Sequence, residues 1–207
     1  MLRRKWGIVI LILGYLLLAG CDSTGIRPGS SANETIPLIS GYTCCNLRHE
    51  GGGDWISELN YIHWPMIPLG TPVSVTQYGW NRAHLDMEGK PMRLGQDYSR
   101  SAFSLEEYVR RVIVPEDPRI KLATYPPDIQ EAIALGKLML GMTKEQVIMS
   151  VGYPLPDENP DMNAPLWRMW TDSFSEYQLI WDDNDRIKEI VADTRLKNVI
   201  VHKRNPG

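Results

Sequence analysis

The feature that most constrains the fold is the stretch "GMTKEQVIMSVGYP", residues 141–154, which carries both the start and the stop signals of a short helix. Thr143 is a favourable N-cap and Gln146 stands three residues later, so this pair predicts a capping box. Gly152, followed by a proline two residues on, predicts the end of the helix after about two turns. A helix this short is unstable by itself. We therefore expect a sheet on which it packs.

That sheet is predicted downstream of the helix. Three β-prone runs of sheet length follow, separated by turn-rich pieces: Leu166–Thr171, Tyr177–Asp182 and Arg186–Ala192. An apolar stripe at helical spacing begins after Pro126, which predicts a further helix before residue 141. The order helix, helix and three-stranded antiparallel meander predicts a two-layer α+β domain over residues 126–207. The last run, Leu196–His202, is expected to add an edge strand or to trail off.

Residues 39–118 are predicted to form a β-rich domain that ends in a helix. Alternating apolar residues such as Val73 and Val75, with a turn signal at Glu88-Gly89, indicate short strands. The pattern "IPLGTPVSV" resembles the opening of SH3-like β-barrel modules, which implies a small sheet or partly closed barrel. Ser104 and Glu107 form a second capping box, which predicts the helix. Residues 119–125 are the predicted linker, and the fold class of the whole chain is α+β.

The N-terminal segment, residues 1–20, has the layout of a secretory signal peptide. Three basic residues precede an apolar run that ends in Leu18-Ala19-Gly20-Cys21. This ending resembles the lipobox of bacterial lipoproteins, which implies cleavage before Cys21 and a diacylglycerol on its thiol, with acyl chains such as palmitate. Two or three acyl chains make a stable anchor, whereas one does not. Residues 21–38 are then the lipidated N-terminus and a flexible tether rich in Ser, Gly and Pro.

Charge and length exclude two other modes of action. Removing residues 1–20 takes away three basic residues and no acidic one, so the formal net charge changes from −3 to −6. An acidic, exported protein has no electrostatic attraction for nucleic acid. The apolar run of the signal, about 15 residues, is short of the roughly 20 that a transmembrane helix needs. We therefore expect attachment to a membrane through a lipid on Cys21, and no nucleic-acid partner.

The C-terminal part resembles the SmpA/OmlA domain, the BamE-like module of bacterial envelope lipoproteins. The resemblance lies in residues 141–154, in Trp167 and in the hairpin "YQLIWDDNDRIKEIV", and it covers about residues 126–194. It implies a lipoprotein that faces the periplasm at the outer membrane and helps the β-barrel assembly machinery, although the family usually lacks a large preceding domain. Asp22 resembles the inner-membrane retention signal instead, so the outer membrane is only slightly favoured.

Cys44 and Cys45 are the first candidates for chemistry. A vicinal disulfide would close a strained eight-membered ring, and the alternatives are buried, reduced or partner-linked thiols. His49, Asp54 and His63 are near in sequence, so a thiol enzyme and a Cys/His metal site are further hypotheses. Adjacent cysteines in an extended chain point to opposite faces and cannot both bind one tetrahedral metal. We expect no enzyme activity, no metal and no cofactor.

Seven tryptophans are many for 207 residues, and most are expected in the core or on a sheet face. An exposed subset would suit recognition of protein or glycan. The candidate contact residues are Trp167, Trp170, Tyr177 and Trp181. The leading hypothesis is a non-enzymatic protein-interaction module that acts in outer-membrane assembly or envelope integrity. The alternative is a cell-wall module that binds peptidoglycan through the SH3-like domain.

Overall fold

The computed structural model describes residues 37–203 of the chain. The predicted signal peptide, Cys21 and all but the end of the tether lie outside these residues. The described residues belong to one compact unit, which contains a six-stranded sheet, a separate three-stranded sheet and several short helices. The expected mixed α+β class is therefore confirmed. Within this part of the chain, no helix combines the length and the apolar character that a bilayer crossing requires.

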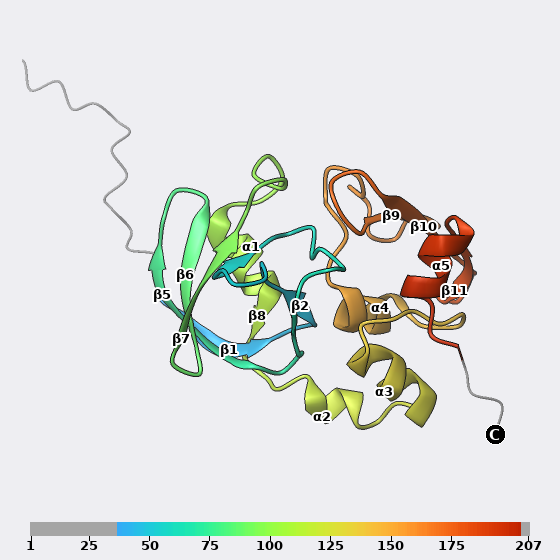
Figure 1. Ribbon diagram of the computed structural model, residues 1–207, viewed down its shortest axis with the longest axis horizontal. Coiled ribbons are helices and arrows are strands. Elements are labelled where there is room, and N and C mark those ends of the chain that lie inside the picture. Colours follow the sequence, from blue (N-terminus) through green and yellow to red (C-terminus); the bar gives the residue numbers. More distant parts are fainter. Residues whose placement is uncertain (1–36, 204–207) are drawn as a thin grey trace, which may run out of the picture. The chain divides into compact units, whose positions relative to one another are not determined.

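The six-stranded sheet lies at the left of Figure 1 and has the order β3-β7-β6-β5-β1-β8. Its strands are β1 (Ser40–Thr43), β3 (Trp55–Ile56), β5 (Pro72–Tyr78), β6 (Arg82–Met87), β7 (Lys90–Gly95) and β8 (Ile113–Val114). Every neighbouring pair is antiparallel except β3 and β7. Two further short strands, β2 (Leu47–Arg48) and β4 (Met66–Ile67), pair with each other.

The β5–β6–β7 meander follows from the alternation in its sequence. Side chains at alternate positions are buried, among them Val75, Leu85 and Leu94, because a period of two turns one face of each strand into the core. The turn between β6 and β7 has a positive φ at both Glu88 (55°) and Gly89 (84°). Two positive φ values are what a type I′ hairpin turn requires, and a glycine supplies one of them without strain.

Helix α1 (Leu105–Val112) closes the first hydrophobic core. The Ser104 hydroxyl accepts a hydrogen bond from the Glu107 N–H, and the Glu107 carboxylate accepts one from the Ser104 N–H at 2.8 Å. This is the predicted capping box. Tyr108 and Val109 lie on the buried face of the helix, and the chain then passes directly into β8.

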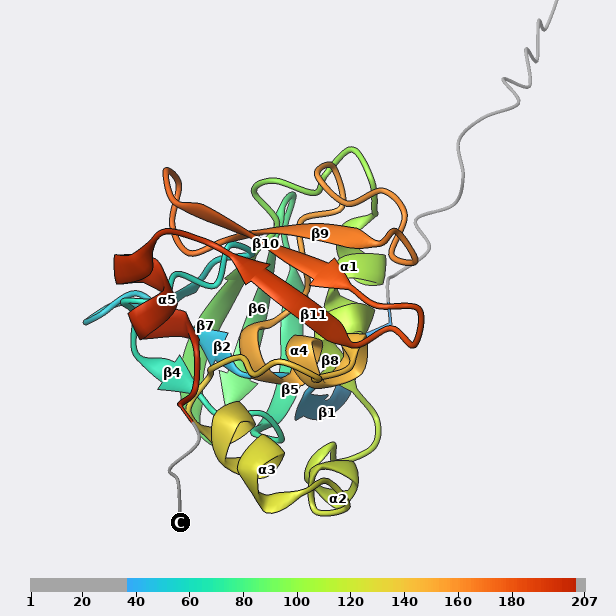
Figure 2. The ribbon, with the colours of Figure 1, turned by 90° about the vertical axis from the view of Figure 1, so that its right-hand side faces the viewer.

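The second part of the chain carries the three-stranded antiparallel sheet, with the order β11-β10-β9. Its elements are α2 (Arg119–Leu122), α3 (Pro127–Ala134), α4 (Lys144–Val151), β9 (Leu166–Trp170), β10 (Glu176–Trp181), β11 (Ile187–Val191) and α5 (Thr194–Ile200). Figure 2 shows this sheet in front of α4, with α3 below it. The predicted linker, residues 119–125, contains the short helix α2.

Helix α4 begins and ends where its sequence predicts. The Thr143 hydroxyl accepts the Gln146 N–H at 3.3 Å, and the Gln146 side chain accepts the Thr143 N–H at 2.9 Å. Gly152 ends the helix with φ at +87°. Val147 is fully buried and packs with Ile133 of α3 and with side chains of the three-stranded sheet in the second hydrophobic core. The sheet supplies the packing that so short a helix needs.

Residues 196–202 neither add an edge strand nor trail off, the two outcomes expected from the sequence, because Thr194–Ile200 form helix α5. The Asp193 carboxylate accepts the Leu196 N–H at 2.8 Å and caps helix α5. Ile200 is buried in the second core, and Val201 forms a single bridge to Leu138 after the helix has ended. An N-cap together with burial of Ile200 therefore outweighs the β propensity of the apolar run around it.

Candidate functional site

Asn46 joins the two hydrophobic cores. Its side-chain amide donates to the carbonyls of Ile133, at 2.6 Å, and Ser150, at 3.0 Å. Its side-chain oxygen accepts the Leu69 N–H at 2.9 Å, and its own N–H donates to the Met149 carbonyl at 3.0 Å. The residue is buried, so these bonds satisfy polar groups that water cannot reach. Asn46 fixes the segment after β1 against α3 and α4.

Asn60 adds a second bridge between the same parts of the chain. Its amide donates to the Asn46 carbonyl and to the Val151 carbonyl, both at 2.9 Å. The backbone of Asn60 has a φ of 50°, a left-handed conformation that asparagine tolerates better than most residues. Together the two asparagines hold the end of α4 against the β3–β4 segment.

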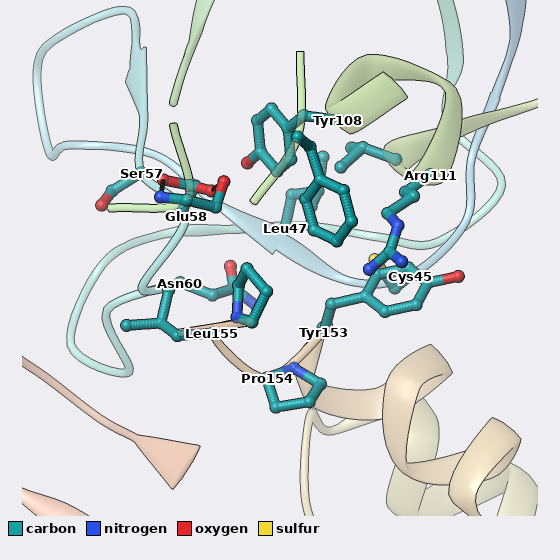
Figure 3. A pocket seen from close by; sticks show the side chains of 15 residues that line it. Cys45, Leu47, Ser57, Glu58, Asn60, Tyr108, Arg111, Tyr153, Pro154 and Leu155 are labelled. Atoms are coloured by element: carbon teal, nitrogen blue, oxygen red, sulfur yellow. Dashed lines mark hydrogen bonds between the residues drawn. The ribbon is translucent and has the colours of Figure 1, made fainter. Parts of the chain in front are cut away.

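A small pocket, here called the junction pocket, opens beside these bonds. Its volume is about 40 Å³, room for a small chemical group such as the end of one side chain. Figure 3 shows Cys45, Glu58, Tyr108, Arg111 and Tyr153 around it. Six further wall residues are apolar: Leu47, Phe103, Val112, Pro154, Leu155 and Pro156. Both halves of the described chain contribute to this wall.

Glu58 holds one wall of the junction pocket in place. Its carboxylate accepts the backbone N–H groups of Tyr98, at 2.6 Å, and Ser99, at 3.1 Å. The Ser99 hydroxyl donates a third bond to the same carboxylate. Hydrogen bonds to a charged acceptor are stronger than those between neutral groups. The loop that follows β7 is therefore fixed against the β3–β4 segment.

The phenol of Tyr108 lines the pocket. This phenol forms no hydrogen bond with another described residue. The side chain is only 9% exposed, and its hydroxyl lies on the side of Glu58 in Figure 3. Burial, with a smaller contribution from the Glu58 charge, raises the pKa of Tyr108 well above its ordinary value. The phenol therefore stays protonated at neutral pH and can donate a hydrogen bond.

Arg111 places a cation at the opposite end of the pocket. Its guanidinium lies 3.8 Å from the centre of the Phe103 ring and 5.6 Å from that of Tyr153, contacts that stabilise a cation over an aromatic face. Arg111 forms no ion pair and no hydrogen bond with another described residue. Burial raises the pKa of Tyr153 to about 12, so this phenol is neutral as well. The guanidinium is oriented by the rings and has its donors available for an anion.

Cys44 and Cys45 are both buried and both free, so the structure does not contain the vicinal disulfide considered from the sequence. Cys45 lines the junction pocket and Cys44 lines a different groove. Burial, together with a hydrogen bond and a charge interaction with Cys45, raises the pKa of the Cys44 thiol well above its ordinary value. A thiolate nucleophile at Cys44 is therefore disfavoured at neutral pH.

The other residues considered for a thiol or metal site do not gather around the cysteines. Asp54 is held by Arg93 through hydrogen bonds of 2.5 and 2.8 Å. The His49 ring is hydrogen-bonded to the Glu50 carbonyl at 2.9 Å, and His63 is exposed. Within residues 37–203, no three His, Cys, Asp or Glu side chains are grouped so that they could hold a metal ion.

The predicted aromatic contact surface is wrong for three of its four residues. Trp167, Tyr177 and Trp181 are buried in the second core, and the Trp167 and Trp181 rings meet edge to face at 4.8 Å. Alternate positions of β9 and β10 turn these side chains toward α3 and α4. Trp170, on the other face of β9, is half-buried.

The exposed aromatic residues lie in turns instead. Trp80, between β5 and β6, is 86% exposed, and Phe174, between β9 and β10, is 95% exposed. Sequence reasoning missed both, although a signal exists. Each stands among turn-forming residues, in "YGWN" and "DSFS", where a side chain has no sheet face on which to pack.

A larger groove, of about 540 Å³, lies between β8, α2 and α4. Val114, Ile148 and Met149 contribute to its apolar lining, and an ion pair of 2.5 Å between Lys121 and Glu145 links α2 to α4. The sequence did not indicate this groove, because it forms between a predicted linker and a predicted domain.

No family model, no curated protein and no solved structure matches this chain. The likeness of residues 126–194 to the SmpA/OmlA domain therefore remains a resemblance of sequence pattern. The function of the protein has to be inferred from its own residues and from their geometry.

Proposed function

We propose that this protein is a lipid-anchored, non-enzymatic interaction module of the bacterial cell envelope, which binds a partner protein through the junction pocket. The lipobox pattern at Leu18 to Cys21 supports an anchor on Cys21. The order α3, α4, β9, β10 and β11 supports a BamE-like domain in the second half of the chain. Outer-membrane assembly or envelope integrity is the proposed process, with the β-barrel assembly machinery as the source of partners.

The observation that carries this proposal is the guanidinium of Arg111, which has no ion-pair partner among residues 37–203 and lies at the end of a small, largely apolar pocket. A guanidinium binds carboxylates through directed hydrogen bonds, and the Tyr108 hydroxyl offers a further donor. The pocket therefore suits a carboxylate carried beside a small apolar group, as at a protein C-terminus or an acidic side chain. Because the asparagine bridges and Glu58 fix the wall, little ordering cost accompanies binding.

The cellular position follows from the N-terminal pattern. We place the folded unit in the periplasm, tethered to the inner leaflet of the outer membrane in preference to the inner membrane. Asp22 opposes this choice by its resemblance to a retention signal. Separation of the two membranes on a density gradient would decide, and recovery of the protein with the inner membrane would contradict the outer-membrane assignment.

Site-specific crosslinking tests the binding of a partner. A photoreactive amino acid replaces Leu155 in the pocket wall, and the matched control carries it at Val199, an exposed residue of α5. We expect discrete crosslinked proteins from position 155, and about tenfold less of them when Arg111→Gln removes the charge-assisted bonds. Equal yields with and without Arg111, or the same products from Val199, would contradict the pocket as a binding site.

The anchor is tested separately with labelled palmitate. The intact chain should incorporate it, and a Cys21→Ser variant should not. Incorporation that persists in the variant would show that the anchor assignment is wrong, whatever the crosslinking result.

A peptidoglycan-binding function is the second candidate. The curled arrangement around the β5–β6–β7 meander supports an SH3-like barrel, a fold class whose loops bind many ligands. Sedimentation of the non-lipidated protein with purified peptidoglycan distinguishes the two functions. A pocket for partner proteins predicts that the protein stays in the supernatant, and co-sedimentation would favour the cell-wall function.

A further inference from the structure

Four exposed apolar residues, Leu38, Trp80, Tyr98 and Phe174, are here called the aromatic edge. They come from the start of the described chain, from the turn between β5 and β6, from the loop after β7 and from the turn between β9 and β10. Exposure of 86% for Trp80 and 95% for Phe174 leaves almost the whole of both rings in contact with water. Exposed apolar groups mark an interaction surface where they lie together in one patch.

Side-chain contacts join three of these segments, those of Trp80, Tyr98 and Phe174, into one edge. The Arg100 guanidinium lies 5.2 Å from the centre of the Trp80 ring. Two residues before Arg100, the Tyr98 hydroxyl lies 3.4 Å from that of Tyr61, which is hydrogen-bonded to the Ser173 hydroxyl at 2.8 Å. Figures 1 and 2 both draw these loops at the upper end of the molecule, opposite α2.

The chain enters the fold at this same edge. The Ile39 carbonyl accepts the Val75 N–H at 2.8 Å, and β1 runs antiparallel to β5. Going backward from Ser40, residues 39 to 37 therefore follow β5 toward its end, where the Trp80 turn begins. Pro37, the first described residue, therefore lies near the turn that carries Trp80.

The length of that segment limits what the edge can reach. Pro37 lies 16 positions after Cys21. If the predicted tether behaves as a Gly/Ser-rich coil, a segment of this length spans about 20 to 24 Å on average, so a lipid on Cys21 would hold the aromatic edge at about that mean distance from the bilayer surface. A membrane is then the surface that the edge meets most often.

We infer that the aromatic edge contacts the interfacial region of the bilayer that carries the lipid anchor. This inference rests on the proposed function in one respect: the lipid on Cys21 determines which membrane the edge contacts. Tryptophan and tyrosine partition to the boundary between lipid headgroups and acyl chains. Arg100, above Trp80, can keep its charge at headgroup level while the ring enters. The contact orients the folded unit, and α2 with the large groove faces away from the membrane.

The orientation is tested by quenching with brominated lipid. The intact lipidated protein is placed in phosphatidylcholine vesicles, and Phe174→Trp adds a reporter at the edge. Ile120→Trp is the matched control, because Ile120 is 74% exposed on α2 at the opposite end. We expect the brominated lipid to quench the fluorescence of the new tryptophan at position 174 and that of Trp80, which is measured as the signal lost in Trp80→Phe. The new tryptophan at position 120 should not be quenched. Equal quenching at positions 174 and 120 would overturn the inference.

A second measurement separates the edge from the anchor. Binding of the chain from Asp22 onward, which carries neither the apolar signal segment nor a lipid, to the same vesicles should be weak, and should fall by about tenfold when Trp80 and Phe174 are both replaced by serine. Ile120→Ser should leave it unchanged. Unchanged binding after the double replacement would contradict the membrane contact of the aromatic edge. A concentration-dependent dimer that buries Trp80 in the absence of lipid would contradict it as well. Failure of palmitate labelling contradicts only the anchor, because this assay does not use it.

Discussion

At the scale of single residues, Asn46 contributes most to the connection between the two cores. Its side chain satisfies two carbonyls and one N–H group that belong to distant parts of the chain. A buried polar group left without a partner costs about 1–3 kcal/mol. The effect of losing Asn46 should therefore exceed that of losing an ordinary surface hydrogen bond.

We predict that Asn46→Ala lowers the free energy of unfolding by about 3 kcal/mol, because three buried groups lose their partner at once. Denaturant unfolding followed by tryptophan fluorescence measures the change. The matched control is Asn163→Ala, in which the replaced side chain is exposed, and its unfolding free energy should change by less than about 0.5 kcal/mol. A loss no greater than that of the control would contradict the bridging role of Asn46.

The cysteines give a second prediction at this scale. Both thiols are buried, and a thiol must be exposed and ionised to react. Iodoacetamide at neutral pH should therefore leave Cys44 and Cys45 unmodified in the folded protein and modify both in denaturant, as mass spectrometry of peptides would show. Rapid alkylation of either thiol in the folded state would revive the hypothesis of a thiol enzyme.

At the scale of elements, the sequence predicted the two capping boxes but not the C-terminal helix α5. The Ser104–Glu107 and Thr143–Gln146 boxes formed as predicted, because a capping box depends only on residues three positions apart. Residues 196–202 were misassigned because burial of Ile200 in the second core, a non-local contact, adds to the Asp193 cap in favouring the helix. Local signals predict what local hydrogen bonds determine.

The end of α4 gives a prediction for this scale. Gly152 has φ at +87°, and an added Cβ would lie 3.2 Å from the Asn60 amide. Gly152→Ala should therefore cost about 1–2 kcal/mol of unfolding free energy, through backbone strain. Gly51→Ala is the control, because an added Cβ there meets only Pro65 at 3.9 Å. Equal thermal midpoints for the two variants would show that the turn after α4 adapts without strain.

At the scale of the whole molecule, the candidate site could not be read from the sequence. The junction pocket combines Cys45 and Glu58 with Arg111 and Tyr153, four residues from four separate segments. Their spacing in the sequence does not indicate that these four residues are neighbours. Only the packing of the two cores brings them together. The same packing buries Trp167 and Trp181, which the sequence offered as surface residues. The number of tryptophans favours an aromatic contact surface, but only the fold determines which rings are exposed to solvent.

Alkaline pH should destabilise the molecule as a whole. Burial raises the pKa of Tyr153 to about 12 and raises those of Tyr108 and Tyr177, whereas a phenol in the unfolded chain has a pKa near 10. Below pH of about 10 both states hold these protons, so stability is unaffected. Between about 10 and 12 the unfolded state releases protons that the folded state keeps, and stability falls as pH rises.

Urea unfolding across this range measures the fall. A Tyr153→Phe variant removes one of the titrating phenols, and it should show a shallower decline than the parent. An unchanged free energy of unfolding from about pH 10 to 12 would contradict the burial of these hydroxyls.

The Asn46 bridge also sets an order in time. Its carbonyl partners Ile133 and Ser150 lie 87 and 104 residues later in the chain. At a synthesis rate of about 5–20 residues per second, the second partner follows after about 5 to 20 seconds. During that interval the first half carries an unpaired amide where its neighbour will later pack. Until α4 is in place this amide is bonded to water, so the connection between the two cores can close only when residues up to 150 are available.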